Sequence, residues 1–227
     1  MRALSIIFTL WAFWPGAAAA ETVCLDAAAK AEAQYDIPDK LLQAITLVET
    51  GRGKDGDLVA WPWTTNLNAT GKYFDTKKEA LRFVQNNMRD GETSIDVGCF
   101  QINTKWHGAK FASIDDMIDP DAAAAYAAKF LLGLREEYGD WNTAAAKYHS
   151  RTPVFSNRYA KKLSAVQGTL LSENDDNKIS TALLTGAAPP LRDGAALGGV
   201  ALSIFLDARP IIDRREQRAL FENAGSP

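Results

Sequence analysis

The stretch Pro38-Asp-Lys-Leu-Leu-Gln-Ala-Ile-Thr-Leu-Val-Glu-Thr50, followed by Gly51, decides how the chain is organised. Its leucine, isoleucine and valine residues recur at spacings of three and four, which predicts an amphipathic helix over residues 38–50. Proline suits the first position of a helix, and glycine suits the position just past its end. We therefore expect Pro38 and Gly51 to bound this helix.

Glu49 falls in the last turn of this predicted helix, on or beside its apolar stripe. Partial desolvation and the negative end of the helix dipole both favour the protonated form of a carboxyl group in that position. A carboxyl group that keeps its proton near neutral pH can act as a general acid. The alternative is a glutamate at a helix edge that extends into solvent.

Length and composition limit the classes of protein to consider. The chain has 227 residues, which suggests one domain with extensions or two small domains. A hydrophobic content of 47% supports a true core. The net charge is −3 and basic residues form no block, so we expect no nucleic-acid partner.

Residues 1–20 resemble a secretory signal peptide. Arg2 precedes an apolar run over residues 3–14, which is too short to span a membrane, and the small residues 18–20 offer a cleavage site. We expect export with cleavage near Ala20; the alternative is an N-terminal anchor that is not cleaved. Two cysteines, Cys24 and Cys99, would remain in the exported chain, where an even count favours a disulfide over two buried thiols.

The rest of the pattern predicts a mostly α-helical fold with a small extended or looped region. Apolar periodicity, capping residues and glycines locate the individual elements. The extended or looped region falls at residues 93–103, and an irregular stretch precedes it at 51–75. Further helices are expected at 26–35, 76–88, 113–118, 120–138, about 140–148 and 156–168. Leu81, Val84 and Met88 are expected to face inward from one helix. Tyr159, Leu163 and Val166 should do so from the last.

The irregular stretch carries two tryptophans around a proline, Trp61 and Trp63. Loops seldom carry so much apolar surface without a use. Flat rings with neighbouring Asn and Thr side chains suit the faces and hydroxyls of sugars. The alternative is that the rings pin the loop onto the core, and one ring could serve each purpose.

We expect residues 169–227 to form a mostly disordered tail. Residues 172–177 and 186–190 have the composition of a linker, and residues 200–206 form an apolar segment that either folds on a partner or packs back onto the domain. His107 and His149 lack ligand partners at motif spacing, so we expect no metal site and no cofactor.

Three motifs in order resemble those of the family 1 lytic transglycosylases, whose soluble-lytic-transglycosylase domain shares the goose-type lysozyme fold. Val48-Glu49-Thr50 resembles the family's Glu-Ser motif, and Val97-Gly-Cys-Phe-Gln-Ile-Asn103 resembles its Gly-Leu-Met-Gln-Ile motif. In Ala146-Lys-Tyr-His-Ser150, only the tyrosine aligns with the family's Ala-Tyr-Asn-Ala-Gly. The Trp-Pro-Trp loop and the Tyr-His-Ser-Arg-Thr-Pro ending resemble a branch that serves flagella or secretion machines.

This resemblance implies that residues 21–168 form a lysozyme-like periplasmic domain that lines a glycan groove. Its substrate would be the glycan strand of peptidoglycan, cut at the β-1,4 bond from N-acetylmuramic acid to N-acetylglucosamine with formation of a 1,6-anhydro product. Glu49 would be the catalytic acid and then the base, helped by the substrate's N-acetyl group. Residues expected to contact the glycan are Thr50, Trp61, Trp63, Gly98, Phe100, Gln101, Asn103, Tyr148 and His149.

Other assignments remain open at the level of sequence. Asp96 and Glu92 are the candidates if a second acid exists, although Asp96 suits a turn or a structural hydrogen bond equally. A hydrolase of the same fold would use water in place of the muramyl hydroxyl. A non-catalytic wall-binding scaffold would use Glu49 structurally. In either case the tail could bind a flagellar rod or secretion component.

Overall fold

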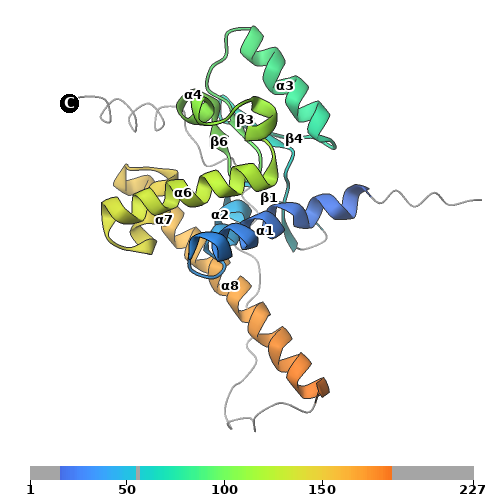
Figure 1. Ribbon diagram of the computed structural model, residues 1–227, viewed down its shortest axis with the longest axis vertical. Helices are drawn as coiled ribbons and strands as arrows, with labels where there is room; N and C mark the ends of the chain where they lie inside the picture. Colours follow the sequence, from blue (N-terminus) through green and yellow to red (C-terminus); the bar gives the residue numbers. More distant parts are fainter. Residues whose placement is uncertain (1–15, 55–56, 186–227) are drawn as a thin grey trace, which may run out of the picture.

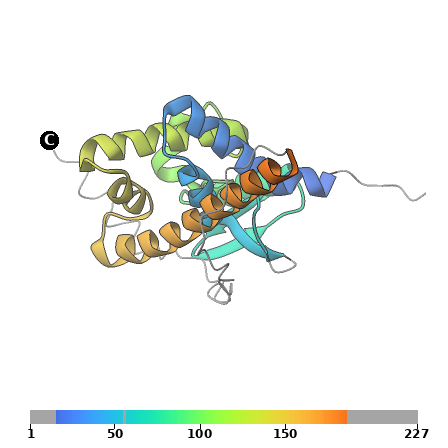
Figure 2. The ribbon, with the colours of Figure 1, turned by 90° about the horizontal axis from the view of Figure 1, so that it is seen from below.

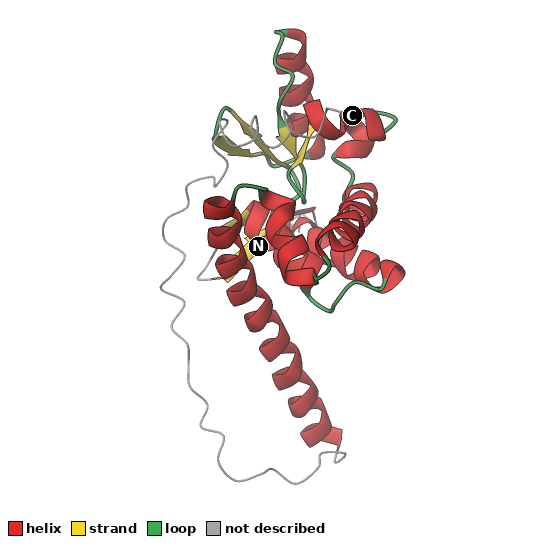
Figure 3. Ribbon diagram, turned by 90° about the vertical axis from the view of Figure 1, so that its left-hand side faces the viewer, coloured by secondary structure: helices red, strands yellow, loops and turns green. Residues whose placement is uncertain are grey.

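The computed structural model describes residues 16–54 and 57–185, and their fold is mostly α-helical, as the sequence predicted (Figure 1). Eight α-helices account for 66% of these residues, together with a small proportion of β-strand. The four-stranded sheet and helix α3 (Lys77–Arg89) lie at one end, and the C-terminal half of α8 (Pro153–Thr185) projects from the other (Figure 3).

Helix α2 (Leu41–Thr50) is the buried centre of the fold. Its residues are buried except Glu49, and it packs against α1 (Gly16–Tyr35), α8 and strand β2 (Asp57–Ala60). The helix starts three residues later than predicted, because Lys40 adopts a left-handed conformation with φ 63°. Pro38 therefore lies in the preceding turn, where its carbonyl accepts the Leu41 amide at 3.1 Å.

The N-terminus of α2 is capped from another helix. The buried Glu32 of α1 accepts the backbone N–H of Gln43 at 3.0 Å and the Gln43 side-chain amide at 2.7 Å. These bonds satisfy a donor that the first turn of a helix leaves free. Lys40, the residue before α2, makes no side-chain capping bond, so Glu32 of α1 supplies the hydrogen-bond acceptor instead.

Helix α1 begins ten residues before the predicted start and continues without interruption through the proposed cleavage point at Ala20. Small buried residues of its inner face, Ala27, Ala28 and Ala31, allow close packing against α2 and α6 (Pro120–Tyr138). Figure 2 shows α1 lying beside α6. Within the described residues, no helix combines the length and apolar character needed to cross a membrane.

The prediction of an irregular stretch over residues 51–75 was wrong, because two antiparallel hairpins form there. Strand β1 (Gly51–Lys54) pairs with β2, and β3 (Thr64–Leu67) pairs with β4 (Thr70–Tyr73). Asn68 and Ala69 join the second pair with φ of 57° and 61°, the positive values that tight hairpin turns use. Two short strands, β5 (Asp96–Val97) and β6 (Ile102–Asn103), complete a sheet in the order β4-β3-β5-β6. The expected extended segment over residues 93–103 is thus confirmed.

Local capping signals located most of the remaining helices correctly. Thr76 and Glu79 form the capping box of α3, Ser113 caps α5 (Ile114–Met117), and Asp119 caps α6. Asp140 caps α7 (Trp141–His149). Two short elements were missed, α4 (Thr104–His107) and a 3₁₀ turn over Gly108–Lys110. In α3, Val84 is buried and Leu81 partly so, but Met88 is 40% exposed, against expectation.

Helix α8 is much longer than the predicted helix over residues 156–168. Tyr159, Leu163 and Val166 are buried as expected, and the helix continues to Thr185. Residues 172–177, interpreted from composition as linker, are therefore helical. Residues 186–190 and the predicted docking segment 200–206 lie outside the described residues, as do residues 1–15 of the proposed signal peptide. The docking segment stays a prediction.

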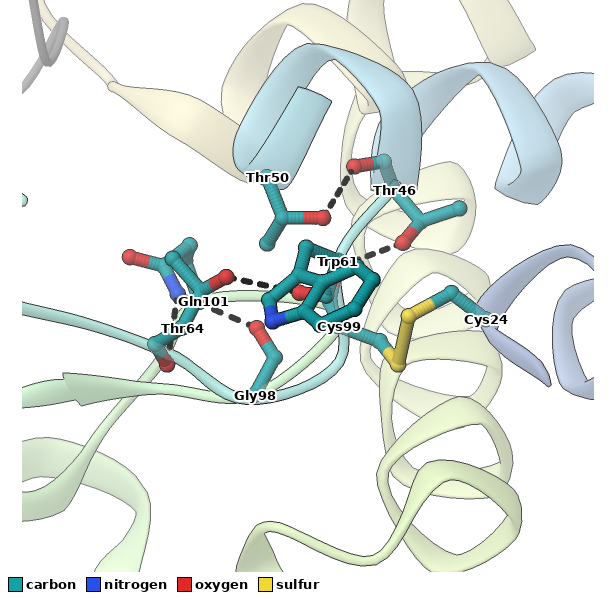
Figure 4. Close-up of a disulfide and its surroundings, with 8 residues drawn as sticks. All are labelled: Cys24, Thr46, Thr50, Trp61, Thr64, Gly98, Cys99 and Gln101. Carbon is teal, nitrogen blue, oxygen red and sulfur yellow. Dashed lines mark hydrogen bonds between the residues drawn. A yellow bond between two sulfur atoms is a disulfide. The ribbon is translucent and has the colours of Figure 1, made fainter. Parts of the chain in front are cut away.

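The predicted disulfide is present between Cys24 of α1 and Cys99 in the turn between β5 and β6 (Figure 4). Both cysteines are fully buried. The Thr46 hydroxyl of α2 also donates to the Cys99 carbonyl at 2.6 Å. These two links fix the turn against α1 and α2, next to the helix end that carries Glu49.

Candidate active site around Glu49

Glu49 lies at the C-terminal end of α2, and its side chain is only 7% exposed. Its Oε1 is 3.8 Å from Nδ1 of His149, whose side chain is 4% exposed. His149 is the last residue of α7 and is separated from Glu49 by a hundred residues. The packing of α2 and α7 thus brings together a carboxyl group and an imidazole that lie in separate motifs of the sequence.

Tyr159 of α8 packs against the Glu49–His149 pair. Its ring is stacked on His149, with centroids 4.5 Å apart and planes 5° from parallel. The Tyr159 hydroxyl has no well-formed hydrogen bond within the described residues, yet burial and then the Glu49 carboxylate raise its pKa well above the ordinary value. The Tyr159 hydroxyl therefore lies near the Glu49 carboxylate.

Tyr148 brings the second and third motifs together. Its hydroxyl donates to the Phe100 carbonyl at 3.1 Å, and its ring meets Phe130 edge to face. Burial, followed by the charge of Glu49, raises the pKa of the Tyr148 hydroxyl well above its ordinary value. Tyr148, which was expected to contact the glycan, thus lies near Glu49 and uses its proton to hold the turn that contains Phe100.

Lys162 is a neighbour of Glu49 that the sequence analysis did not identify. Burial lowers the pKa of its ammonium group, and the nearby Glu49 charge opposes that shift. It lies three residues after Tyr159, so both side chains lie on the same side of α8. This spacing was visible in the sequence, but nothing local indicated that this side of α8 faces Glu49.

The turn between β5 and β6 contains two residues with positive φ. Gly98 has φ 72°, a region that side chains disfavour, and an added Cβ would lie 3.5 Å from the Ile118 backbone. Gln101 also has a positive φ, 46°, and its amide donates to the Gly98 carbonyl at 3.0 Å and the Thr64 carbonyl at 3.4 Å (Figure 4). Strain of this kind at a non-glycine residue is often found at functional sites.

Four residues predicted to bind glycan are used by the fold instead. Phe100 is 1% exposed and belongs to the core. Thr50 is fully buried, and its hydroxyl donates to the Thr46 carbonyl at 2.9 Å within the helix (Figure 4). The buried Asn103 donates to Asp96 at 2.8 Å and to Ser94 at 3.0 Å. These side chains have little surface with which to contact a ligand, and Asp96 is held as a structural partner of Asn103.

The fourth is Trp61, because the two tryptophans have different environments. Trp61 is 4% exposed, its indole N–H donates to the Phe74 carbonyl at 2.7 Å, and the Arg52 guanidinium lies 3.6 Å from its ring centroid. It therefore pins the hairpins to one another. Trp63 is only partly buried and keeps surface available for a ligand.

Comparisons of the chain with protein-family models, curated proteins and solved structures found no match. Among the described residues, no group of three or more His, Cys, Asp or Glu side chains could hold a metal ion. The groups that the structure places around the Glu49 carboxyl are an imidazole, an ammonium group and two phenols. Such a cluster can give and take a proton in a largely dry environment.

Proposed function

We propose that this protein is a lytic transglycosylase, which cleaves the MurNAc-β-1,4-GlcNAc bond of peptidoglycan with Glu49 as acid and base. The observation that carries the proposal is the enclosure of Glu49 at the end of a buried helix, next to His149, Tyr148, Tyr159 and Lys162. The three motifs that suggested the family supply Glu49, the strained turn and Tyr148.

The proposed reaction needs one carboxyl group that changes role. Protonated Glu49 donates its proton to the glycosidic oxygen as the bond from C1 breaks, and the N-acetyl group of the same sugar stabilises the developing positive charge. Glu49 then accepts the proton of the C6 hydroxyl as that oxygen attacks C1. The products are a 1,6-anhydro sugar and a free hydroxyl on the leaving strand, and Glu49 is protonated again.

The disulfide supports the proposed export, because such bonds persist in oxidising compartments such as the periplasm. The His149 side chain is 4% exposed and the Tyr148 hydroxyl is bonded to the Phe100 carbonyl, so neither has much to offer a glycan. Gly98, Gln101 and Trp63 are the remaining candidates for glycan contact. Gly98 leaves the backbone of the turn without a side chain. Trp63 offers part of a ring face to a sugar. Service to a flagellar or secretion machine is part of the proposal and depends on the chain beyond Thr185.

The test is mass analysis of purified sacculi digested with the wild-type protein, with Glu49→Gln and with Glu136→Gln as a surface control. We expect anhydro-muropeptides from the wild type and the control, and a loss of at least about a hundredfold in Glu49→Gln, as removal of a general acid predicts. Products with a reducing end that borohydride reduces would identify a hydrolase instead. Absence of any cleavage by the wild type would favour a scaffold.

A further inference from the structure

Arg52 is a partly buried cation whose side chain forms no ion pair and no hydrogen bond within the described residues. It lies in β1, and its guanidinium is 3.6 Å from the ring centroid of Trp61 and 5.8 Å from that of Tyr73. Its Nε is buried without an acceptor. Burial of a cation without a counter-ion is costly, so this position favours a negatively charged ligand.

Arg135 offers a comparison within the same chain. Its guanidinium lies 5.8 Å from the ring centroid of Trp141, and its Nε is likewise buried without an acceptor. Arg135 has an acid nearby, because hydrogen bonds with Thr143 and, more weakly, the charge of Arg135 lower the pKa of Asp140. What distinguishes Arg52 is its place, in the strand that leaves the helix carrying Glu49. Arg135 is therefore a matched control.

The backbone holds Arg52 close to Glu49. Because β1 starts directly where α2 ends, Arg52 is the third residue after Glu49, which limits the separation of their Cα atoms to about 10 Å. The backbone N–H of Trp61 donates to the carbonyl of Thr50 at 3.4 Å, so the residue that carries the guanidinium on its ring is tied to the last residue of α2. A substrate that lies at Glu49 and bears a side branch can therefore reach Arg52.

The contact with Trp61 determines how a ligand approaches Arg52. The guanidinium lies over the face of the Trp61 ring, which covers one of its two flat sides. The N–H donors of a guanidinium lie in its plane and point outward from its edge, where a planar carboxylate can accept two parallel hydrogen bonds. The sugars of peptidoglycan offer hydroxyls and amides, whereas its carboxylates belong to the peptide stems.

We propose that Arg52 binds a carboxylate of the peptide stem, so that the protein acts on glycan that carries peptides in preference to bare glycan. This inference rests on the proposed function, because the peptide reaches Arg52 when the sugar that bears it lies at Glu49. Arg52 is a specificity residue in this account. It holds the peptide and exchanges no proton with the sugar.

Binding tests the inference without relying on cleavage. The ligands are a disaccharide–tetrapeptide from peptidoglycan and the same compound with its carboxylates converted to amides, each added to the full chain with Glu49→Gln. In titration calorimetry we expect the carboxylate form to bind about tenfold more tightly, as one charge-assisted hydrogen bond predicts. The preference should disappear when Arg52→Gln is added and should remain when Arg135→Gln is added.

Arg52→Lys guards against a loss that comes only from a disturbed hairpin. It keeps the positive charge and an aliphatic chain over Trp61 but lacks the planar fork, so we expect a reduced preference in a folded protein. Near-ultraviolet circular dichroism checks the fold of each variant. Equal binding of the two ligands by the parent protein, or an undiminished preference in either Arg52 variant, would overturn the inference.

Cleavage of sacculi tests the consequence for the substrate. On sacculi that keep their peptide stems, Arg52→Gln should release anhydro products about tenfold more slowly than the wild type at low substrate concentration. On sacculi stripped of stems by an amidase, the two rates should be equal. Equal losses on both substrates would mean that Arg52 only supports the hairpins, which would overturn the inference. A carboxylate preference in binding without anhydro products from the wild type would count against the proposed function alone.

Discussion

At the scale of single residues, Gly51 shows that a correctly predicted residue can have a different physical role. Glycine was expected just past the end of the helix, and Gly51 lies there with φ −62°, an extended conformation that does not require glycine. Glycine is needed at position 51 because there is no room for a side chain. An added Cβ would lie 2.3 Å from the Leu47 carbonyl oxygen and 2.7 Å from Leu58. The close approach lets β1 start directly where α2 ends.

Gly51→Ala should therefore destabilise the protein, whereas Gly53→Ala should not. The Leu47 oxygen belongs to the helix backbone and cannot move aside cheaply, so we expect a loss of about 3 kcal/mol in the free energy of unfolding. Gly53 lies in the same strand, and its added Cβ would meet nothing within 4 Å. Urea unfolding of both variants measures the difference, and equal stability would contradict the steric argument.

At the scale of elements, α2 depends on α1 for its N-terminal cap. Glu32 is buried, and desolvation raises the pKa of its carboxyl group despite the hydrogen bonds from Gln43 that favour the charged form. Helices with a Ser, Thr, Asp or Asn cap, such as α3 and α6, need no such help. The first turn of the helix that carries Glu49 is therefore stabilised by α1.

We expect Glu32→Ala to lower the free energy of unfolding by about 1–3 kcal/mol, because the Gln43 donors lose a buried acceptor. A raised pKa in the folded state means that the folded protein binds this proton more tightly than the unfolded chain. The associated stabilisation is complete below the ordinary pKa of glutamate and is lost as pH rises through the raised value.

The stability difference between wild type and Glu32→Ala should accordingly shrink as pH rises through the raised pKa of Glu32. Urea unfolding at a series of pH values from about 4 to about 7 measures it, with Glu136→Gln as the exposed control. A difference that grows with pH would mean that the hydrogen bonds outweigh desolvation and that the pKa is lowered instead.

At the scale of the whole molecule, the Cys24–Cys99 disulfide connects the first helix to the strained turn across 75 residues of sequence. The loop that it closes contains all of α2 and both hairpins. Closing such a long loop restricts the unfolded chain more than the folded one. The bond should therefore stabilise the fold strongly while changing its native geometry little.

Replacement of both cysteines by alanine should lower the free energy of unfolding by about 4 kcal/mol, as the chain-entropy account gives for a loop of this length. Reduction of the wild type should have a similar effect, and the near-ultraviolet circular dichroism of the folded protein should be largely retained. A loss below about 1 kcal/mol in both cases would indicate that the unfolded chain is already compact between Cys24 and Cys99.

The sequence by itself determined the elements whose signals are local. Capping residues and glycines located α3, α5, α6 and α7 to within a residue or two, because the hydrogen bonds that end a helix join neighbours in the chain. Apolar spacing placed Glu49 in the last turn of a buried helix. Export chemistry and an even cysteine count predicted the disulfide.

Only the tertiary structure decided which side chains surround Glu49 and which candidates are buried. His149, Tyr159 and Lys162 lie a hundred or more residues away along the chain, and Glu32 caps α2 from another helix. Trp61 and Trp63 lie two residues apart in the link between β2 and β3, and they differ because Trp61 contacts the Phe74 carbonyl and the Arg52 guanidinium, which come from other segments. Contacts between distant segments depend on how whole helices and strands pack, and no local pattern encodes that.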